Sequence, residues 1–429
     1  MSASDRAERP ITLLIASVGG TPDPIVASLK NWQPARVLFV PSEETRNEIE
    51  SRVLPLAASE GLQLSPGCYD FCVLPDGQDL SACIRKLRDL NAEVARWLDR
   101  GSDYRIVVDF TGGTKCMSAA LAIHSHRWQC LFSYIGGSQR TKGGVGVVVS
   151  GAEKVVFAEN PWDALGYQAV EEALTLFNEG AYASSRRLLD QVMLNIGDAA
   201  RRRQVNALKL LADAYDAWDR FDHKAARNNL AKLAGAANDL QAQLNVPSTE
   251  QLLTVVSRHM ELLATLDASR GPSLSIVLDL LANAQRRGRE GRYDDAVARL
   301  YRAIEAFAQH QLREPHGIGD TGNVPLERIP EPLRSEWAPY ARDGLLKLAL
   351  QDSYALLRQL HDCAGAAFHE LGLDDREKSP LFHRNLSILA HGFQPVGEKA
   401  FQQLWSAALS LTSLTSEEIP EFPRLPTSF

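Results

Sequence analysis

The chain has 429 residues, enough for two or three domains, and its 45% hydrophobic and 23% charged residues are typical of a soluble globular protein. A net charge of −7 argues against non-specific coating of nucleic acid. No apolar run reaches the roughly 18 residues of a membrane span, and residues 1–10 are too polar for a signal peptide. We therefore expect a cytoplasmic protein without membrane contact.

Apolar strands and helices alternate through the first 160 residues. The expected strands are 11–18, 36–40, 69–74, 104–110, 130–135 and 146–149, the last with 154–157 as a hairpin partner. The expected helices are 24–30, 43–52, 80–100 and 117–125. This alternation predicts a doubly wound, Rossmann-like α/β sheet. The six cysteines form no Cys-x-x-Cys pair, which indicates a reduced protein without a zinc ribbon.

Two glycine loops follow strands of this predicted sheet. Ser17-Val18-Gly19-Gly20-Thr21 follows the first strand, and Asp109-Phe110-Thr111-Gly112-Gly113-Thr114-Lys115 follows the fourth. Parallel strands end at one edge of a sheet, so the loops should meet there. Glycines let backbone N–H groups approach an anion, and a helix N-terminus and Lys115 add positive charge. Neither loop has the spacing of a Walker A or dinucleotide motif, and each taken alone is equally consistent with a tight structural turn.

The second loop, together with Met117, resembles the signature of the CARF domain of type III CRISPR ancillary proteins. The resemblance implies a sensor of cyclic oligoadenylate, of the tetra- or hexa-adenylate type. The residues implied to line the activator pocket are Ser17, Gly19, Gly20, Thr21, Thr111, Gly112, Gly113, Thr114 and Lys115. Gly136-Gly137-Ser138 would form a third side.

Residues 161–271 have helical periodicity and predict a helical connector, with a break at 245–248. Residues 177–182 and 290–296 are two similar helix–turn–helix corners. The basic runs 201–203 and 286–289 are candidate RNA contacts, but a solvated helix face is the favoured interpretation of each.

The last third, residues 272–429, predicts a helical bundle. Residues 293–312 form a strongly amphipathic helix whose Glu305 is expected to pair with Arg302. A long loop is expected over 314–336 and further helices over 345–361 and 381–391.

The segment 383–392 carries Arg384, Asn385 and His391. On a continuous helix a separation of seven is two turns, which would place Arg384 and His391 on one stripe. A histidine can move a proton near neutral pH, and an arginine can clamp a phosphate as charge builds on it. This pair suits RNA cleavage by the RNA's own 2′-hydroxyl, a reaction that requires no metal. His383 offers a competing imidazole.

The spacing of Arg384 and His391, with six residues between them, Asn385 directly after the arginine and Gly392 directly after the histidine, resembles the active-site motif of HEPN ribonucleases. With the N-terminal loops, the chain resembles the CARF–HEPN group of type III CRISPR ancillary nucleases (Csm/Csx type). The resemblance implies catalysis by Arg384, Asn385 and His391, a homodimer, an activator in place of a cofactor or metal, and single-stranded RNA cut to 2′,3′-cyclic phosphate and 5′-hydroxyl ends. The implied domains are 1–160 (CARF), 161–271 (connector) and 272–429 (HEPN).

Two alternatives remain open from the sequence. One is a non-catalytic sensor of a cyclic oligonucleotide whose helical half binds a protein partner. The other is a ring nuclease, in which Thr114 or Lys115 positions the 2′-oxygen of the cyclic activator for its own cleavage. The remaining histidines show no metal-ligand spacing.

Overall fold

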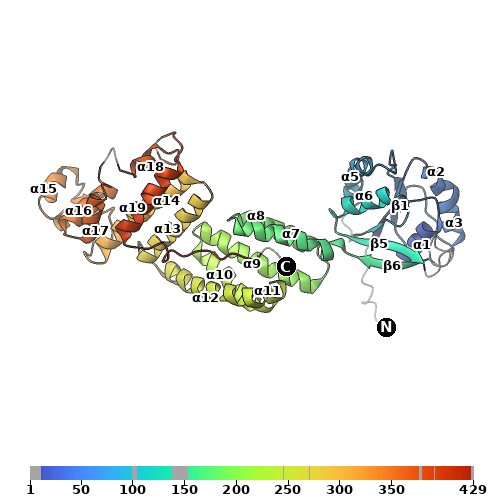
Figure 1. Cartoon of the computed structure of the whole chain (residues 1–429), viewed down its shortest axis with the longest axis horizontal. Coiled ribbons are helices and arrows are strands. Elements are labelled where there is room, and N and C mark those ends of the chain that lie inside the picture. Colours follow the sequence, from blue (N-terminus) through green and yellow to red (C-terminus); the bar gives the residue numbers. More distant parts are fainter. Residues whose placement is uncertain are drawn as a thin grey trace. The chain divides into compact units, whose positions relative to one another are not determined.

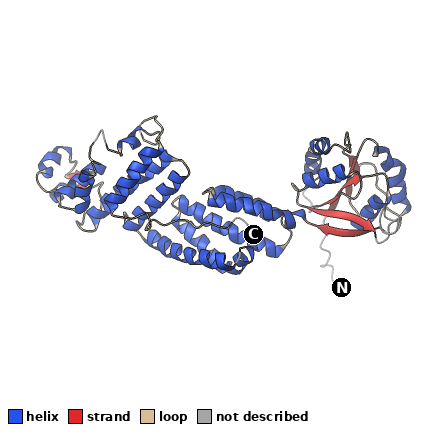
Figure 2. Ribbon diagram, viewed as in Figure 1, coloured by secondary structure: helices blue, strands red, loops and turns tan. Residues whose placement is uncertain are grey.

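The computed structural model describes residues 11–98, 104–137, 153–244, 246–269, 271–375, 379–390 and 392–426. The chain forms two compact units, which are considered separately: Met1–Glu171 with Leu188–Val205, and Glu172–Arg187 with Asn206–Phe429. Strands gather in the first unit, and the second is built almost entirely from helices (Figures 1 and 2). The domain boundaries expected after residues 160 and 271 stay predictions. No helix among the described residues is long and apolar enough to cross a membrane.

The first unit is organised around a six-stranded sheet. Its strands are β1 (Ile11–Val18), β2 (Arg36–Pro41), β3 (Tyr69–Phe71), β4 (Tyr104–Asp109), β5 (Cys130–Gly137) and β6 (Glu153–Glu159). They lie in the order β3-β2-β1-β4-β5-β6, with β1 to β5 parallel and β6 antiparallel to β5. The order reverses direction beside β1, between the carboxyl ends of β1 and β4. Such switch points are where doubly wound sheets bind ligands.

Helices cover both faces of the sheet (Figure 1). They are α1 (Asp23–Trp32), α2 (Arg46–Glu48), the π-helical turn η1 (Ile49–Val53), α3 (Leu54–Ser59), α4 (Leu80–Leu87), α5 (Leu90–Leu98) and α6 (Lys115–Ser125). Leu13 and Ile15 point into the core under α4 and α6, whereas Leu14 and Ala16 point into the core under α1 and α3. Because both faces are buried, β1 reads as a continuous apolar run. The predicted doubly wound fold is confirmed.

Some expected elements differ in the structure. The helix predicted over 80–100 is two helices, because the chain turns at Arg88-Asp89, where the amide of Asp89 bonds the carbonyl of Lys86. The segment 43–52 is helical only from Arg46 onward and then widens into the π-turn η1. The strand expected at 146–149 lies outside the described residues, and its expected hairpin partner is β6, which pairs with β5.

The connector is helical, as expected. Its helices are α7 (Pro161–Asn178), α8 (Tyr182–Asn195), α9 (Ala199–Asp219), α10 (His223–Gly235), α11 (Ala237–Gln243) and α12 (Val246–Ala268). The expected corner between α7 and α8 turns at Gly180, whose φ of +82° favours glycine. The break expected at 245–248 is placed too late, because α11 ends at Gln243 and residues 246–248 already belong to α12.

The C-terminal bundle is centred on the long hairpin of α13 and α14. Its elements are α13 (Leu274–Arg289), α14 (Tyr293–Arg313), β7 (Val324–Pro325), η2 (Leu326–Arg328), α15 (Leu333–Trp337), η3 (Ala338–Tyr340), β8 (Leu345–Leu346), α16 (Leu350–Gln359), α17 (Cys363–Glu370), α18 (Phe382–Leu386) and α19 (Glu398–Thr412). The amphipathic stripe of α14 is buried in the core, as predicted, and Arg302 pairs with Glu305 at 3.2 Å. The expected loop 314–336 carries short elements, and the helix expected from residue 345 begins only at Leu350.

The segment after α19 returns along the second unit and inserts Phe422 among aromatic side chains of the connector. The Phe422 ring centroid lies 4.7 Å from that of Tyr215 and 5.0 Å from that of Trp218, and the Arg286 guanidinium stacks over the Phe422 ring at 3.8 Å. Asn178 exchanges two hydrogen bonds with the backbone of Leu425, at 2.7 and 2.8 Å. The C-terminal segment therefore joins the connector to the bundle within this unit.

Replacing Phe422 with alanine is expected to lower the free energy of unfolding of the second unit by about 2–4 kcal/mol, because a packed aromatic side chain is lost and a cavity remains. Tyr340→Ala is the matched control, since the Tyr340 side chain is 76% exposed. Denaturant unfolding of both variants checks this. Equal midpoints for the two would show that the segment contributes no packing energy.

Candidate functional sites

The two glycine loops meet at the carboxyl ends of β1 and β4, as predicted. A Cβ atom added at Gly112 would lie 2.4 Å from the Ser17 carbonyl oxygen, and one added at Gly19 would lie 2.7 Å from the Gly113 nitrogen. The buried Ser17 hydroxyl donates a hydrogen bond to the Gly112 carbonyl at 2.7 Å. Glycine is therefore required at both positions for the two backbones to come into contact, and the Ser17 hydrogen bond stabilises this contact.

Asp109, the last residue of β4, anchors the second loop. One carboxylate oxygen accepts the Thr111 amide at 2.9 Å, and the other accepts the Ser28 and Ser133 hydroxyls at 2.7 and 3.2 Å. The side chain is buried. Burial raises the pKa of Asp109 above its ordinary value, and these hydrogen bonds oppose the rise. Asp109 therefore supports the loop and does not face a ligand.

The hydroxyl groups of both threonines in the loop form hydrogen bonds within the protein. The Thr111 hydroxyl oxygen accepts the Ile135 amide at 2.7 Å. Thr114 caps α6 by accepting the Met117 amide at 3.2 Å, and its hydroxyl donates to the Gly77 carbonyl. Because its hydroxyl has two backbone partners, Thr114 is poorly placed to act on a ligand's 2′-oxygen.

The remaining predicted residues of this site face outward. Gly20, Thr21, Gly113 and Lys115 are exposed, and Gly19 and Gly112 are partly exposed. Lys115 is the first residue of α6, so its charge adds to the positive end of that helix. Exposed glycines, a helix N-terminus and a lysine together are features suited to receiving phosphate groups. Of the suggested third side, Gly136 and Gly137 end β5, and Ser138 lies outside the described residues.

The second candidate site lies on α18, which packs against α14 of the bundle. The guanidinium of Arg384 stacks over the ring of Tyr301 at 4.5 Å, and its Nη1 donates to the Asn385 side-chain oxygen at 3.3 Å. Cation–π stacking of this kind holds a guanidinium in one plane while its N–H edges stay available for a phosphate. Asn385 is exposed beside it. The structure therefore brings Arg384 and Asn385 together.

The predicted continuous helix over 381–391 is wrong, because α18 ends at Leu386. Ser387 adopts an extended backbone, and its hydroxyl donates to a carboxylate oxygen of Asp294 at 2.6 Å and accepts the Leu389 amide at 3.1 Å. A serine that bonds its own neighbourhood competes with helix continuation. Arg384 is therefore not followed by a continuous helix that could place residue 391 on the same stripe. His391 itself lies outside the described residues.

Gly392, the last motif residue, has a steric role that the motif alone does not show. A Cβ atom there would lie 2.1 Å from the Leu386 carbonyl oxygen. Its amide bonds the Ser387 carbonyl at 3.2 Å, and the Gln394 amide bonds the Leu386 carbonyl at 2.9 Å. The chain therefore folds back directly onto the end of α18, and only glycine fits at the point of return.

Sequence reasoning missed the apolar surface around this motif. Phe382, Ile388, Leu389 and Phe393 are exposed, and Ile388 and Leu389 are 67% and 51% accessible. Exposed apolar groups of this kind mark an interaction surface. The run Leu386 to Phe393 could have signalled it, but on a helix its apolar residues would have been assigned to the core.

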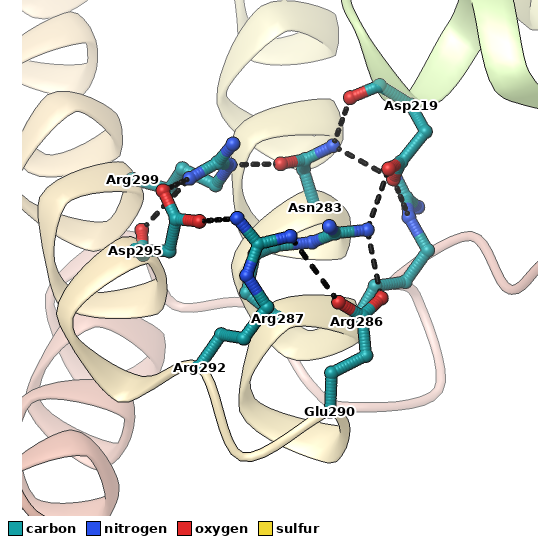
Figure 3. Close-up of polar contacts among 8 residues, drawn as sticks. All are labelled: Asp219, Asn283, Arg286, Arg287, Glu290, Arg292, Asp295 and Arg299. Carbon is teal, nitrogen blue, oxygen red and sulfur yellow. Dashed lines mark hydrogen bonds and ion pairs between the residues drawn. The ribbon is translucent and has the colours of Figure 1, made fainter. Parts of the chain in front are cut away.

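The favoured interpretation of the basic run 286–289 as a solvated helix face is wrong for Arg286 and Arg287, which are only 9% and 7% exposed. Both pair with Asp219 of the connector (Figure 3). In the run 201–203, Arg201 is likewise buried, and it stacks over Tyr167 at 3.4 Å. These three arginines are structural and do not provide the RNA-binding patch that the sequence left open.

Among the described residues, no group of three or more His, Cys, Asp or Glu side chains is placed to hold a metal ion. His316 pairs with Asp362 at 3.0 Å, and His369 pairs with Asp374 at 2.5 Å.

Comparison with known proteins matches both helical regions to one family. Residues 266–415 match the family model of the Csm6 HEPN domain, and residues 165–263 match that of the Csm6 6H domain. The CRISPR system endoribonuclease Csm6 of Thermus thermophilus is 26% identical over 349 residues, which cover 74% of this chain and 71% of that protein. The structure is similar to that of Enterococcus italicus Csm6 bound to cyclic hexa-2′-fluoro-hexa-dAMP, with a TM-score of 0.55 at 11% identity over 96% of each chain. That likeness supports the fold.

Proposed function

Because this chain belongs to the Csm6 family of CARF–HEPN proteins, we propose that it is an endoribonuclease of type III CRISPR defence that cyclic oligoadenylate activates. The observation that carries this proposal is the Arg384–Asn385 pair, which is held on Tyr301 inside the segment that matches the HEPN family model. Solvent-facing polar groups held in one orientation beside an apolar surface are suited to binding a substrate.

The proposed reaction is transesterification within single-stranded RNA. The 2′-hydroxyl gives up its proton as its oxygen attacks the neighbouring phosphorus, the bond from phosphorus to the 5′-oxygen breaks, and that 5′-oxygen takes up a proton. His391 moves the proton at the attacking or the leaving oxygen, and Arg384 stabilises the charge that builds on the phosphorane. Asn385 hydrogen-bonds Arg384 or a phosphate oxygen. The products are a 2′,3′-cyclic phosphate and a 5′-hydroxyl, and no step requires a metal ion.

The proposed activator site is the rim of the sheet where the glycine loops meet. Gly20, Thr21, Gly113 and Lys115 are exposed there and would contact the phosphates of the ring. The other predicted residues would support the site without contacting the phosphates, because their contacts hold the two loops in place. They are Ser17, Gly19, Thr111, Gly112 and Thr114. Binding would stabilise an arrangement of the catalytic region that is poorly populated without activator.

We further propose a homodimer. A cyclic oligoadenylate with an even number of nucleotides has twofold symmetry, which suits a site shared by two copies of the rim. The exposed apolar side chains beside Arg384 would be covered where two bundles meet, and the meeting place would form one RNA cleft from two motifs.

Product analysis tests the proposed chemistry. A short RNA cut in the presence of EDTA and activator is expected to give fragments whose masses correspond to a 2′,3′-cyclic phosphate and a 5′-hydroxyl. Fragments with a 3′-hydroxyl and a 5′-phosphate, or cleavage that EDTA abolishes, would contradict the mechanism, because they indicate attack by water at a metal centre.

A further inference from the structure

We propose that Asp219, at the end of α9 in the connector, is a positioning residue for the catalytic segment of the bundle. Polar contacts of buried and half-buried residues lead from its carboxylate through Asn283 and Arg299 to Asp295 (Figure 3). The neighbouring residue in the same helical turn, Asp294, holds the segment that follows Arg384 and Asn385. This inference rests on the proposed function, because it assigns to the connector a role in setting the activity of that site.

The first link joins α9 to α13. The Asp219 carboxylate accepts hydrogen bonds from Arg286 Nε at 2.9 Å, from Arg287 Nη2 at 2.5 Å and from Asn283 Nδ2 at 3.1 Å. Asn283 Nδ2 also donates to the Asp219 backbone carbonyl at 2.9 Å. The Asp219 side chain is 13% exposed, and Asn283 is fully buried. Charged groups with so little solvent hold one geometry strongly, since water cannot substitute for a lost partner.

The second link joins α13 to the first turn of α14. The Asn283 amide group is oriented by Asp219, so its oxygen points away from that residue and accepts a hydrogen bond from Arg299 Nε. Arg299 Nη1 in turn donates to the Asp295 carboxylate at 2.6 Å and to the Asp295 carbonyl at 3.0 Å. An amide whose two ends are both used cannot flip without losing contacts on both sides. The position of Asp219 is thereby transmitted to the start of α14.

The third link joins α14 to the catalytic segment. Asp294 precedes Asp295 in the same helical turn, and one of its carboxylate oxygens accepts the Ser387 hydroxyl at 2.6 Å. Its other oxygen accepts the Val396 amide at 3.2 Å. Asp294 therefore holds both ends of the segment 387–396, which begins directly after α18. A small displacement of the first turn of α14 moves both ends together.

The polar contacts around Asp219 are also shielded from solvent on the side of the connector. Arg286 stacks on Phe422 at 3.8 Å, and its two Nη atoms are buried without a hydrogen-bond partner among the described residues. Arg287 has a second anchor in Glu290 at 2.8 Å. Removing the charge of Asp219 would leave Arg286 without its carboxylate and would weaken the hydrogen bond that orients the Asn283 amide.

A purely structural ion network is the competing explanation, and the fold contains a matched control for it. Asp279 lies one turn before Asn283 on the same helix, is fully buried, and accepts Trp218 Nε1 at 2.8 Å and His223 Nε2 at 2.7 Å. It thus joins the connector to α13 as Asp219 does. No described contact continues from Asp279 to α14, so Asp279→Asn should cost stability without disturbing the catalytic segment.

The test compares Asp219→Asn with Asp279→Asn in the full chain, at saturating activator. Asp219→Asn is expected to lower kcat for RNA cleavage by about tenfold, with KM and the Kd for cyclic oligoadenylate within about twofold of wild type. Asp279→Asn is expected to keep kcat within about twofold. A second variant, Arg299→Gln, removes the link between Asn283 and Asp295 at a more exposed position. It should lower kcat as Asp219→Asn does, and it replaces Asp219→Asn in the test if the Asp219 variant folds poorly. Equal losses of kcat in the Asp219 and Asp279 variants, or an unchanged kcat in Asp219→Asn and Arg299→Gln, would overturn the proposal.

Amide hydrogen exchange separates this inference from the proposed function, because it needs no RNA cleavage. The peptide containing Gly392 and Val396, whose amides are bonded in the wild type, is expected to exchange faster in Asp219→Asn than in Asp279→Asn. If the wild type does not cleave RNA, the proposed function fails and this exchange measurement still decides the inference. Identical exchange of that peptide in both variants would overturn it.

Discussion

Replacing His391 with alanine is expected to reduce activator-stimulated RNA cleavage by about 10²- to 10⁴-fold, the usual contribution of a general acid or base. Arg384→Ala should cause a loss of similar size, because no other cation among the described residues is held beside Asn385 as Arg384 is. Binding of cyclic oligoadenylate should be unchanged in both variants, since the activator site lies in a different unit. Initial rates on a fluorescent RNA and isothermal titration with activator measure the two effects.

His383→Ala is the control for the histidine prediction, because His383 offers the competing imidazole in the motif. It should keep most of the wild-type rate. Full activity in His391→Ala together with loss in His383→Ala would transfer the proton-moving role to His383. Full activity in both would leave the Arg384 pair as a structural feature and would favour the non-catalytic sensor.

Replacing Gly112 with alanine is expected to weaken binding of cyclic oligoadenylate by more than about tenfold. The added Cβ would lie 2.4 Å from the Ser17 carbonyl oxygen and 2.9 Å from the Gly19 nitrogen, so the two loops must separate. Overpacking of backbone against backbone should also lower the free energy of unfolding of the first unit by about 1–3 kcal/mol. Activator-stimulated cleavage should fall in parallel with binding.

Gly20→Ala is the matched control for folding, because a Cβ at Gly20 would meet nothing within 4 Å. Thermal unfolding of the two variants is the measurement, with titration of activator into each folded protein. A Gly112→Ala protein that binds activator as tightly as wild type would show that the contact between the loops does not shape the activator site.

The sheet could be predicted in detail because its signals are local. Each buried parallel strand is an apolar run that a glycine, proline or polar turn ends, and β1 occupies the predicted residues 11–18. The meeting of the two glycine loops followed from topology alone. The break at Arg88-Asp89 could not be predicted, because a two-residue turn inside an amphipathic pattern leaves the period of the apolar residues almost unchanged.

The catalytic segment shows where sequence reasoning failed. Its apolar residues fit a helix, but a contact 93 positions away, between Ser387 and Asp294, ends α18 at Leu386. The buried state of Arg286 and Arg287 was equally hidden, since their partner Asp219 lies in another part of the sequence. In both cases a carboxylate that is distant in the sequence decides the local structure, and a pattern of neighbouring residues cannot reveal such a contact.

The central claim is that an activator bound at the sheet switches on metal-independent RNA cleavage at His391 and Arg384. The most direct test is cleavage of a fluorescent single-stranded RNA in EDTA, with cyclic tetra-adenylate, cyclic hexa-adenylate or neither, by wild type and His391→Ala. Cleavage by the wild type is expected with one of the two rings, with little cleavage without a ring and none above background in the variant. Equal cleavage with and without a ring, or cleavage that survives in His391→Ala, would contradict it.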